Sequence, residues 1–147
     1  MTKELLTIEH INAQSLQSNY EEVKLLILER DIDVLCISET WPHSHTSDDL
    51  IAIPDYILFR NDGGRGGGVC IYVRNTLKTH VINLHEPDEL TPPDIEGLFL
   101  TVQHCMLPAT IIGCIYRHPK APAVSFEYIC NTLQSLCNSK KKNLYSR

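Results

Sequence analysis

The chain has 147 residues, of which 43% are hydrophobic, and its formal net charge at pH 7 is −5. This length and composition suit one domain with a buried core, and no apolar stretch reaches the roughly 20 residues of a membrane-spanning helix. The acidic charge excludes the broad basic surface with which non-specific nucleic-acid binders neutralise phosphates. It leaves room for a local basic cleft, built from arginines near predicted strand ends: Arg60, Arg65, Arg74 and Arg117.

The six cysteines are an even number, which in a small secreted protein would suggest disulfides. The chain, however, begins with charged residues where a signal peptide carries apolar ones, and it contains no N-x-[ST] sequon. Cys36, Cys70 and Cys114 lie in strand-like apolar runs, and Cys130 and Cys137 lie in a helical one. We therefore expect buried free thiols in an intracellular protein of the nucleus or cytoplasm, with no disulfide-linked partner and no membrane association.

The first part of the chain predicts a β-α-β unit. Residues 5–12 alternate well enough for a half-buried strand, and residues 19–31 have apolar positions at helical spacing with acids in the first turn. Ser18 and Asn19 are candidate N-caps of this helix. The apolar run 34–37 predicts a buried second strand, parallel to the first because β-α-β units place their strands in that way.

The remainder of the chain predicts mostly antiparallel strands and a closing helix. A polar loop with one helical turn near Asp48 comes first, and the glycine-rich segment 63–68 predicts a hairpin turn, because a strand follows it and the GK[ST] of a phosphate loop is absent. Further strands are expected at 55–60, 68–74, 78–84, 95–105 and 110–117. The closing helix is expected at 121–138, with an apolar face formed by Phe126, Ile129, Leu133 and Leu136. Together these elements predict an α/β sandwich of mixed, mostly antiparallel sheets covered by helices, although two helices are few for two sheets.

Polar side chains stand where predicted strands end. Asn12 ends the first strand and Glu39 follows the second, so both should lie at the carboxyl edge of one sheet, where ligand sites form in α/β proteins. A carboxylate beside an amide oxygen suits Mg²⁺, although a loop-capping glutamate and a turn asparagine explain the same residues. Tyr116 and Arg117 end a later strand and could together hold a phosphate, or they could be a rim tyrosine and a solvated arginine.

Five segments occur in this order in one known family: "HINAQSL", "DVLCISETW", "RNDGGRGGGVCIYV", "IEGLFL" and "IIGCIYRHP". With these segments the chain resembles the endonuclease domain of non-LTR (LINE-type) retrotransposons, in the endonuclease/exonuclease/phosphatase superfamily. The resemblance covers about residues 5–137. It implies a four-layer α/β sandwich and hydrolysis of DNA phosphodiester bonds that depends on Mg²⁺ or Mn²⁺ and nicks the insertion target.

The resemblance also implies roles for individual residues. Glu39 matches the glutamate that ligates the metal, and Asn12 matches the strand-end asparagine close to it. Tyr116 matches the tyrosine that contacts the scissile phosphate. Arg117 and Pro119 match the motif that follows this tyrosine. Asn12, Glu39 and Tyr116 are therefore the expected catalytic residues, with Glu39 and Asn12 at the metal and Arg117 as a further phosphate contact.

Two later segments of the family have no counterpart in this sequence. They are a "GDFN" strand and an Asp-His segment whose histidine acts as the general base. We therefore expect residues 1–137 to form a partial, C-terminally truncated domain and residues 138–147 to form a divergent basic tail. The corresponding expectation for function is an endonuclease fragment that is inactive in this form. Alternatives are a non-catalytic binding module and a decayed reading frame without function.

Overall fold

A computed structural model describes the backbone of residues 5–42, 46–62, 67–84 and 91–145, and the side chains of these residues as far as position 139. Within these residues it contains seven β-strands and two α-helices. They are β1 (Ile8–Asn12), α1 (Tyr20–Glu29), β2 (Val34–Ser38), β3 (Tyr56–Asn61), β4 (Val69–Arg74), β5 (Lys78–Val81), β6 (Ile95–Gln103), β7 (Thr110–Arg117) and α2 (Ala123–Tyr145), with a short 3-10 helix, η1 (Asp48–Leu50), between β2 and β3.

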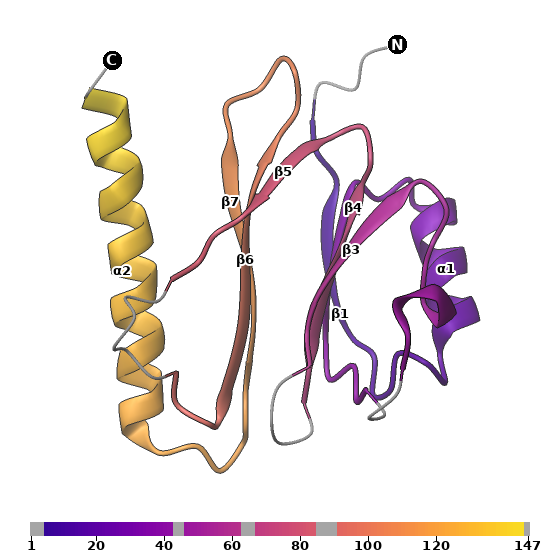
Figure 1. Ribbon diagram of the computed structural model, residues 1–147, viewed down its shortest axis with the longest axis horizontal. Helices are drawn as coiled ribbons and strands as arrows, with labels where there is room; N and C mark the ends of the chain where they lie inside the picture. The colour runs from indigo at the N-terminus through magenta and orange to yellow at the C-terminus, as the bar shows by residue number, and fades with distance from the viewer. Residues whose placement is uncertain (1–4, 43–45, 63–66, 85–90, 146–147) are drawn as a thin grey trace.

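The strands form two sheets that pack face to face. Sheet A has the order β1-β2-β4-β3 and sheet B has the order β5-β6-β7. Helix α1 lies on the outer face of sheet A and helix α2 on the outer face of sheet B, so the molecule has four layers (Figure 1). The predicted four-layer sandwich of mixed sheets is confirmed, and two helices suffice because each covers one sheet.

The predicted β-α-β unit begins sheet A. Strands β1 and β2 pair in parallel, and β4 and β3 join them by antiparallel pairing. Helix α1 turns Val23 and Ile27 inward, and Glu21 and Glu22 lie in its first turn, where carboxylates favour a helix dipole. Asn19 occupies the N-cap position without a side-chain capping bond, because its amide group donates to the carbonyls of the preceding loop instead.

Strand β2 is buried along its whole length because it lies between α1 and sheet B. Its alternate side chains therefore enter two different hydrophobic clusters. Leu35 and Ile37 pack towards α1, whereas Val34 and Cys36 pack towards sheet B. This explains why the segment is a continuous apolar run and not an alternating one, as is usual for a strand with both faces covered.

Sheet B is antiparallel throughout. Strand β7 has the predicted bounds, whereas β5 and β6 begin where predicted and end three and two residues earlier. Strands β5 and β6 pair from Lys78–Gln103 to Val81–Leu100, and β6 pairs with β7 along eight positions. Most of the glycine-rich segment and residues 85–90 of the proline-containing loop lie outside the described residues. The β3–β4 pairing on either side of the glycines is antiparallel, as a hairpin requires.

Helix α2 differs from the prediction in its length and in its buried face. It continues to Tyr145 and so includes residues predicted as a tail. Phe126 and Leu133, expected on the apolar face, are exposed, whereas Leu136 is buried and Ile129 is half-buried. The inward side of the helix is instead marked by Ser125 and Leu136, a narrower stripe than the apolar spacing suggested.

The six cysteines are all free thiols, but they are not all buried. Cys36, Cys70 and Cys114 are inside, as expected for strand residues. Cys130 and Cys137 lie on exposed positions of α2, and Cys105 is exposed in the β6–β7 turn, so the prediction of burial is wrong for the helix.

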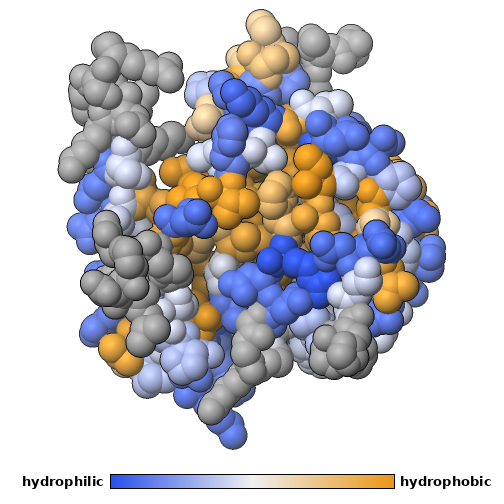
Figure 2. All heavy atoms as spheres, in the orientation of Figure 1, coloured by the Kyte–Doolittle hydropathy of each residue, from blue (hydrophilic) through white to orange (hydrophobic). Residues whose placement is uncertain are grey.

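No helix among the described residues combines the length and the hydrophobicity of a membrane span. In the view of Figure 1, hydrophobic side chains gather in the middle of the face, between the layers, and hydrophilic side chains surround them (Figure 2). The two hydrophobic clusters are thus sandwich interiors, one beneath α1 and one between the sheets.

An ion pair between Asp33 and Arg74 lies at the end of sheet A opposite to Glu39. Asp33 accepts hydrogen bonds from Arg74 Nε at 3.0 Å and from the Thr7 amide at 2.8 Å, and its side chain is only 5% exposed. Removing the Asp33 carboxylate leaves the Thr7 amide without its acceptor and takes from Arg74 its buried partner. Arg74 then keeps Asp31 and the Ile32 carbonyl as acceptors.

We predict that Asp33→Ala lowers the free energy of unfolding by about 2–3 kcal/mol, as measured by urea denaturation. The matched control is Asp48→Ala, which removes an exposed partner of Arg60 and should cost about 0.5 kcal/mol or less. Equal losses in the free energy of unfolding for the two substitutions would contradict the conclusion that the buried Asp33 carboxylate stabilises the fold.

Candidate functional site

The two strand-end residues predicted to meet are neighbours in space. Asn12 is the register partner of Ser38, so the residue that follows β1 and the residue that follows β2 emerge at the same edge of sheet A. The Ala13 amide donates to the Ser38 carbonyl at 3.0 Å, and the Ser15 amide donates to the Glu39 carbonyl at 3.0 Å. The loops after the two strands are therefore bonded to one another beside Asn12 and Glu39.

Glu39 has a strained backbone that its neighbours hold in place. Its φ is 54°, in the left-handed region that non-glycine residues rarely adopt, and Trp41 has a φ of 44°. The amides of Thr40 and Trp41 donate to the carbonyls of Gly68 and Gly67 at 3.3 and 3.0 Å. Strain of this kind persists only where surrounding contacts fix it, and it is common at functional sites.

Tyr116 reaches this edge from the second sheet. It lies on β7 opposite Glu96 of β6, on the face of sheet B that packs against sheet A. Glu96 is 5% exposed and accepts a hydrogen bond from the Gly68 amide. A Cβ atom at Gly67 would overlap both the Tyr116 ring and the Glu96 carboxylate. The backbone of Gly67 and Gly68 thus fills the space between the loop of Glu39 and the ring of Tyr116.

Two carboxylates, those of Glu39 and Glu96, influence the pKa of Tyr116. Its pKa is raised above the ordinary value for tyrosine, first by burial and then by the negative charges of Glu39 and Glu96. The phenol therefore stays protonated at neutral pH and keeps its O–H donor. The loop of Glu39 and the ring of Tyr116, predicted from separate strand ends, thus lie on either side of Gly67 and Gly68 at the junction of the two sheets.

Asn12 lies at the edge of this site, with an exposed side chain. Its Oδ1 accepts a hydrogen bond from the Gln14 amide at 3.2 Å, which leaves a second lone pair on the oxygen. Glu39 and Asn12 together offer the hard oxygen donors that Mg²⁺ prefers, with waters completing its shell. In the described part of the chain, no three His, Cys, Asp or Glu side chains group closely enough to hold a metal by themselves.

Arg117 is not brought to the same face as Tyr116. Successive residues of a strand point to opposite faces, and the Nη2 of Arg117 donates to the Ala121 carbonyl at 2.8 Å in the turn before α2. A joint phosphate grip by the two neighbours, as the sequence suggested, would need a different conformation of the arginine.

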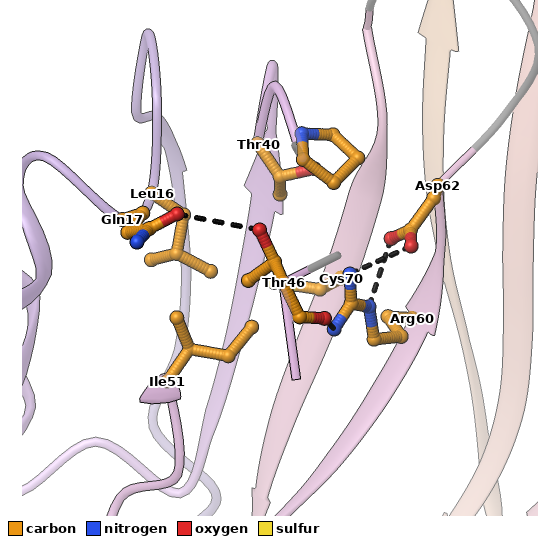
Figure 3. Close-up of a pocket in the computed structure, with 9 residues that line it drawn as sticks. Leu16, Gln17, Thr40, Thr46, Ile51, Arg60, Asp62 and Cys70 are labelled. Atoms are coloured by element: carbon orange, nitrogen blue, oxygen red, sulfur yellow. Dashed lines mark hydrogen bonds and ion pairs between the residues drawn. The ribbon is translucent and has the colours of Figure 1, made fainter. Parts of the chain in front are cut away.

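The arginines that the sequence suggested for one basic cleft are dispersed. Arg74 pairs with Asp31 and Asp33 at the opposite end of sheet A. Arg60 lines a hollow on the α1 side of that sheet, where it binds Asp62 at 2.6 Å (Figure 3). It also binds Asp48 at 2.8 Å. Since these guanidinium groups are already paired with carboxylates, the cleft is absent from the described residues; Arg65 lies outside them.

Three residues near the candidate site were not predicted from the sequence: Glu96, His10 and Ser38. Glu96 was quoted only as part of a motif, although its place on the same strand face as Leu98 and Leu100 marks a carboxylate pointing into the core. His10 and Ser38 were also missed. His10 Nε2 lies 3.0 Å from Ser38 Oγ; His10 is two residues before Asn12, and Ser38 is one residue before Glu39. Only the parallel register of β1 and β2 brings these two side chains together, so residue spacing alone gave no signal.

A model of the endonuclease/exonuclease/phosphatase family matches residues 10–134, which is most of the chain. The chain therefore belongs to the endonuclease/exonuclease/phosphatase family. The matched part runs from within β1 to about the middle of α2, and it includes the edge that carries Glu39 and Tyr116.

Among solved structures, the chain is similar to the AP endonuclease LMAP from Leishmania major, with a TM-score of 0.53 and 16% sequence identity. The match covers 93% of this chain and 47% of that one, so the chain spans about half the length of this structural relative. At this identity the similarity establishes the fold. A comparison with curated protein sequences gives no match.

We predict that Glu39→Gln lowers the pKa of Tyr116, because the substitution removes one of the negative charges that oppose formation of the phenolate. The measurement is a pH titration of the tyrosine ring-carbon NMR signals, with Tyr116 assigned from the Tyr116→Phe variant. Glu29→Gln, on the exposed end of α1, is the matched control and should leave the value unchanged.

The raised pKa of Tyr116 also predicts that the folded protein loses stability at alkaline pH. Because the folded-state pKa is raised, the proton on Tyr116 stabilises the fold fully below the unfolded pKa of about 10, and this stabilisation is lost as the pH rises through the folded-state pKa.

For the titration experiment, a Tyr116 pKa that does not respond to Glu39→Gln would show that the two side chains do not share a site.

Proposed function

We propose that the chain carries the metal-binding part of a Mg²⁺-dependent DNA endonuclease of the non-LTR retrotransposon type, which nicks the insertion target. The observation that carries this proposal is the convergence of Glu39 and Tyr116, from different sheets, at one edge of the sandwich. Membership of the family and the five sequence segments quoted above support the same chemistry.

Glu39 and Asn12 would hold the metal ion. Their oxygen donors suit Mg²⁺, and Mn²⁺ takes the same ligands. Two carboxylates beside Tyr116 would repel a DNA phosphate, so a divalent cation at this edge is needed to reverse the local charge. When bound, Mg²⁺ supplies Lewis-acid stabilisation of the charge on the phosphate and the leaving oxygen.

Tyr116 would hold a non-bridging oxygen of the scissile phosphate. Its raised pKa keeps the phenol protonated, so that it donates a hydrogen bond to the phosphate and does not repel it. Glu96 would not ligate the metal in this scheme, because it is buried and accepts the Gly68 amide. Its role is to hold the Gly67–Gly68 backbone between the two halves of the site.

We further propose that these 147 residues do not cleave DNA by themselves. Hydrolysis needs a general base that activates water, and the family's Asp-x-Asn and Asp-His segments have no counterpart in this sequence. The loss of proton transfer alone costs about 10²–10⁴ in rate. Metal binding without catalysis is therefore the expected state of the isolated chain.

The alternative is a non-catalytic binding module. The observation in its favour is that the described residues form two buried hydrophobic clusters, which support a fold apart from any catalytic use. DNA binding that is unchanged by Glu39→Ala and independent of Mg²⁺ would favour this module over the endonuclease fragment.

We predict that Mn²⁺ selectively broadens the amide NMR signals of Ala13 and Thr40, the neighbours of Asn12 and Glu39, and that excess Mg²⁺ restores them. Glu39→Ala should weaken this effect about tenfold or more, because it removes the one charged ligand. Glu29→Ala, which removes an exposed carboxylate of α1, is the control. Broadening that survives Glu39→Ala would place the metal elsewhere.

In a plasmid-nicking assay with Mg²⁺, we predict that the 147-residue chain relaxes supercoiled DNA no faster than its Glu39→Ala variant. A complete endonuclease of the same family serves as the positive control. Nicking by the chain that Glu39→Ala abolishes would disprove inactivity and at the same time support the proposed metal ligand.

A further inference from the structure

Two buried cysteines face each other across the interface of the two sheets. Cys36 lies in the middle of β2 in sheet A, and Cys114 lies on β7 in sheet B. Both belong to the hydrophobic cluster between the sheets, where they are 5% and 3% exposed. The Sγ atom of Cys114 is 3.5 Å from the carbonyl oxygen of Ile37, the residue next to Cys36. This contact places the Cys114 thiol directly against β2.

The two thiols also lie close enough to affect each other's pKa. The Cys114 thiol lowers the pKa of Cys36, whereas the Cys36 thiol and burial raise the pKa of Cys114, which donates to the Ile37 carbonyl. The thiolate is the reactive form of cysteine, so Cys36 has the character of an attacking sulfur and Cys114 that of its partner. Cys70 differs, because burial raises its pKa and it packs on the α1 side of sheet A.

We propose that Cys36 and Cys114 are a redox site, in which hydrogen peroxide forms a reversible disulfide that joins the two sheets. The Cys36 thiolate attacks one peroxide oxygen, the O–O bond breaks, and protonation of the leaving hydroxide releases water, which leaves a sulfenic acid. The Cys114 sulfur then attacks the Cys36 sulfur, and its proton leaves with the hydroxyl group as a second water. Two electrons pass from the thiols to the peroxide, and a dithiol reductant returns them.

The bond would connect the two strands that carry the candidate site. Cys36 precedes Glu39 by three residues in the chain, and Cys114 precedes Tyr116 by two. A covalent link at this point closes a loop that contains β3 to β6, so it restricts the unfolded chain strongly. Oxidation would thus fix the spacing between the strands of Glu39 and Tyr116 and stabilise the fold, whether or not the site binds a metal.

Peptide mapping after peroxide treatment tests the proposal. The experiment uses the Cys105→Ser variant, which changes an exposed turn residue. Trypsin digestion of this variant yields the peptide 31–60, whose only cysteine is Cys36, and the peptide 79–117, whose only cysteine is Cys114. Remaining thiols are alkylated before digestion. We expect a linked pair of these peptides, lighter by two hydrogens, that dithiothreitol separates. Fragment spectra of the linked pair from the wild-type chain, whose peptide 79–117 contains both Cys105 and Cys114, check that the same Cys36–Cys114 link forms without the substitution.

The oxidised protein should also melt about 5 °C or more above the reduced one, a shift that Cys36→Ala abolishes. Cys130 and Cys137 are exposed and report in the same sample that the peroxide has acted. The absence of the linked pair when Cys130 and Cys137 are oxidised would overturn the proposal, and so would a link from Cys36 to Cys70. Neither result depends on nuclease activity or metal binding, so failure here is separable from failure of the proposed function.

Discussion

The backbone of Gly67 and Gly68 occupies a space between the two sheets that has no room for a side chain. On one side its carbonyls accept the amides of Thr40 and Trp41, which hold the strained turn at Glu39. On the other side the Gly68 amide is bound by Glu96 of sheet B. Through this close approach one loop fixes the distance between the two halves of the sandwich where the candidate site lies. The position of Glu39 relative to Tyr116 depends on it.

The fold follows from local patterns to a large extent. The β-α-β unit could be predicted because apolar spacing, acidic residues in the first helical turn and a run of buried residues agree with one another. Helix α2 was harder. Its apolar residues at 126, 129, 133 and 136 suggest a broad buried stripe, but Phe126 and Leu133 are 58% and 46% exposed, and Leu133 borders an open hollow against β6 and β7. Which apolar residues a sheet covers is a tertiary property that periodicity does not contain.

The site was predictable only in part, for a related reason. Asn12 and Glu39 could be placed together because parallel strands end at a common edge, which is a rule of topology. Tyr116 could be named from the motif but could be placed only by packing sheet B on sheet A. Glu96, Ser38 and His10 depend on strand register and on contacts between residues far apart in the chain. Arg117 shows the reverse case, since its neighbour in sequence lies on the opposite face of the strand.

The chain has one tryptophan, and it is attached to this same loop. Trp41 donates its amide to the Gly67 carbonyl, two residues beyond Glu39, and its side chain is 44% exposed. An indole at a partly solvated position changes its emission when its backbone moves. The chain therefore carries its own optical probe at the junction of the two sheets, and a fluorescence spectrum reads the state of that junction without any label.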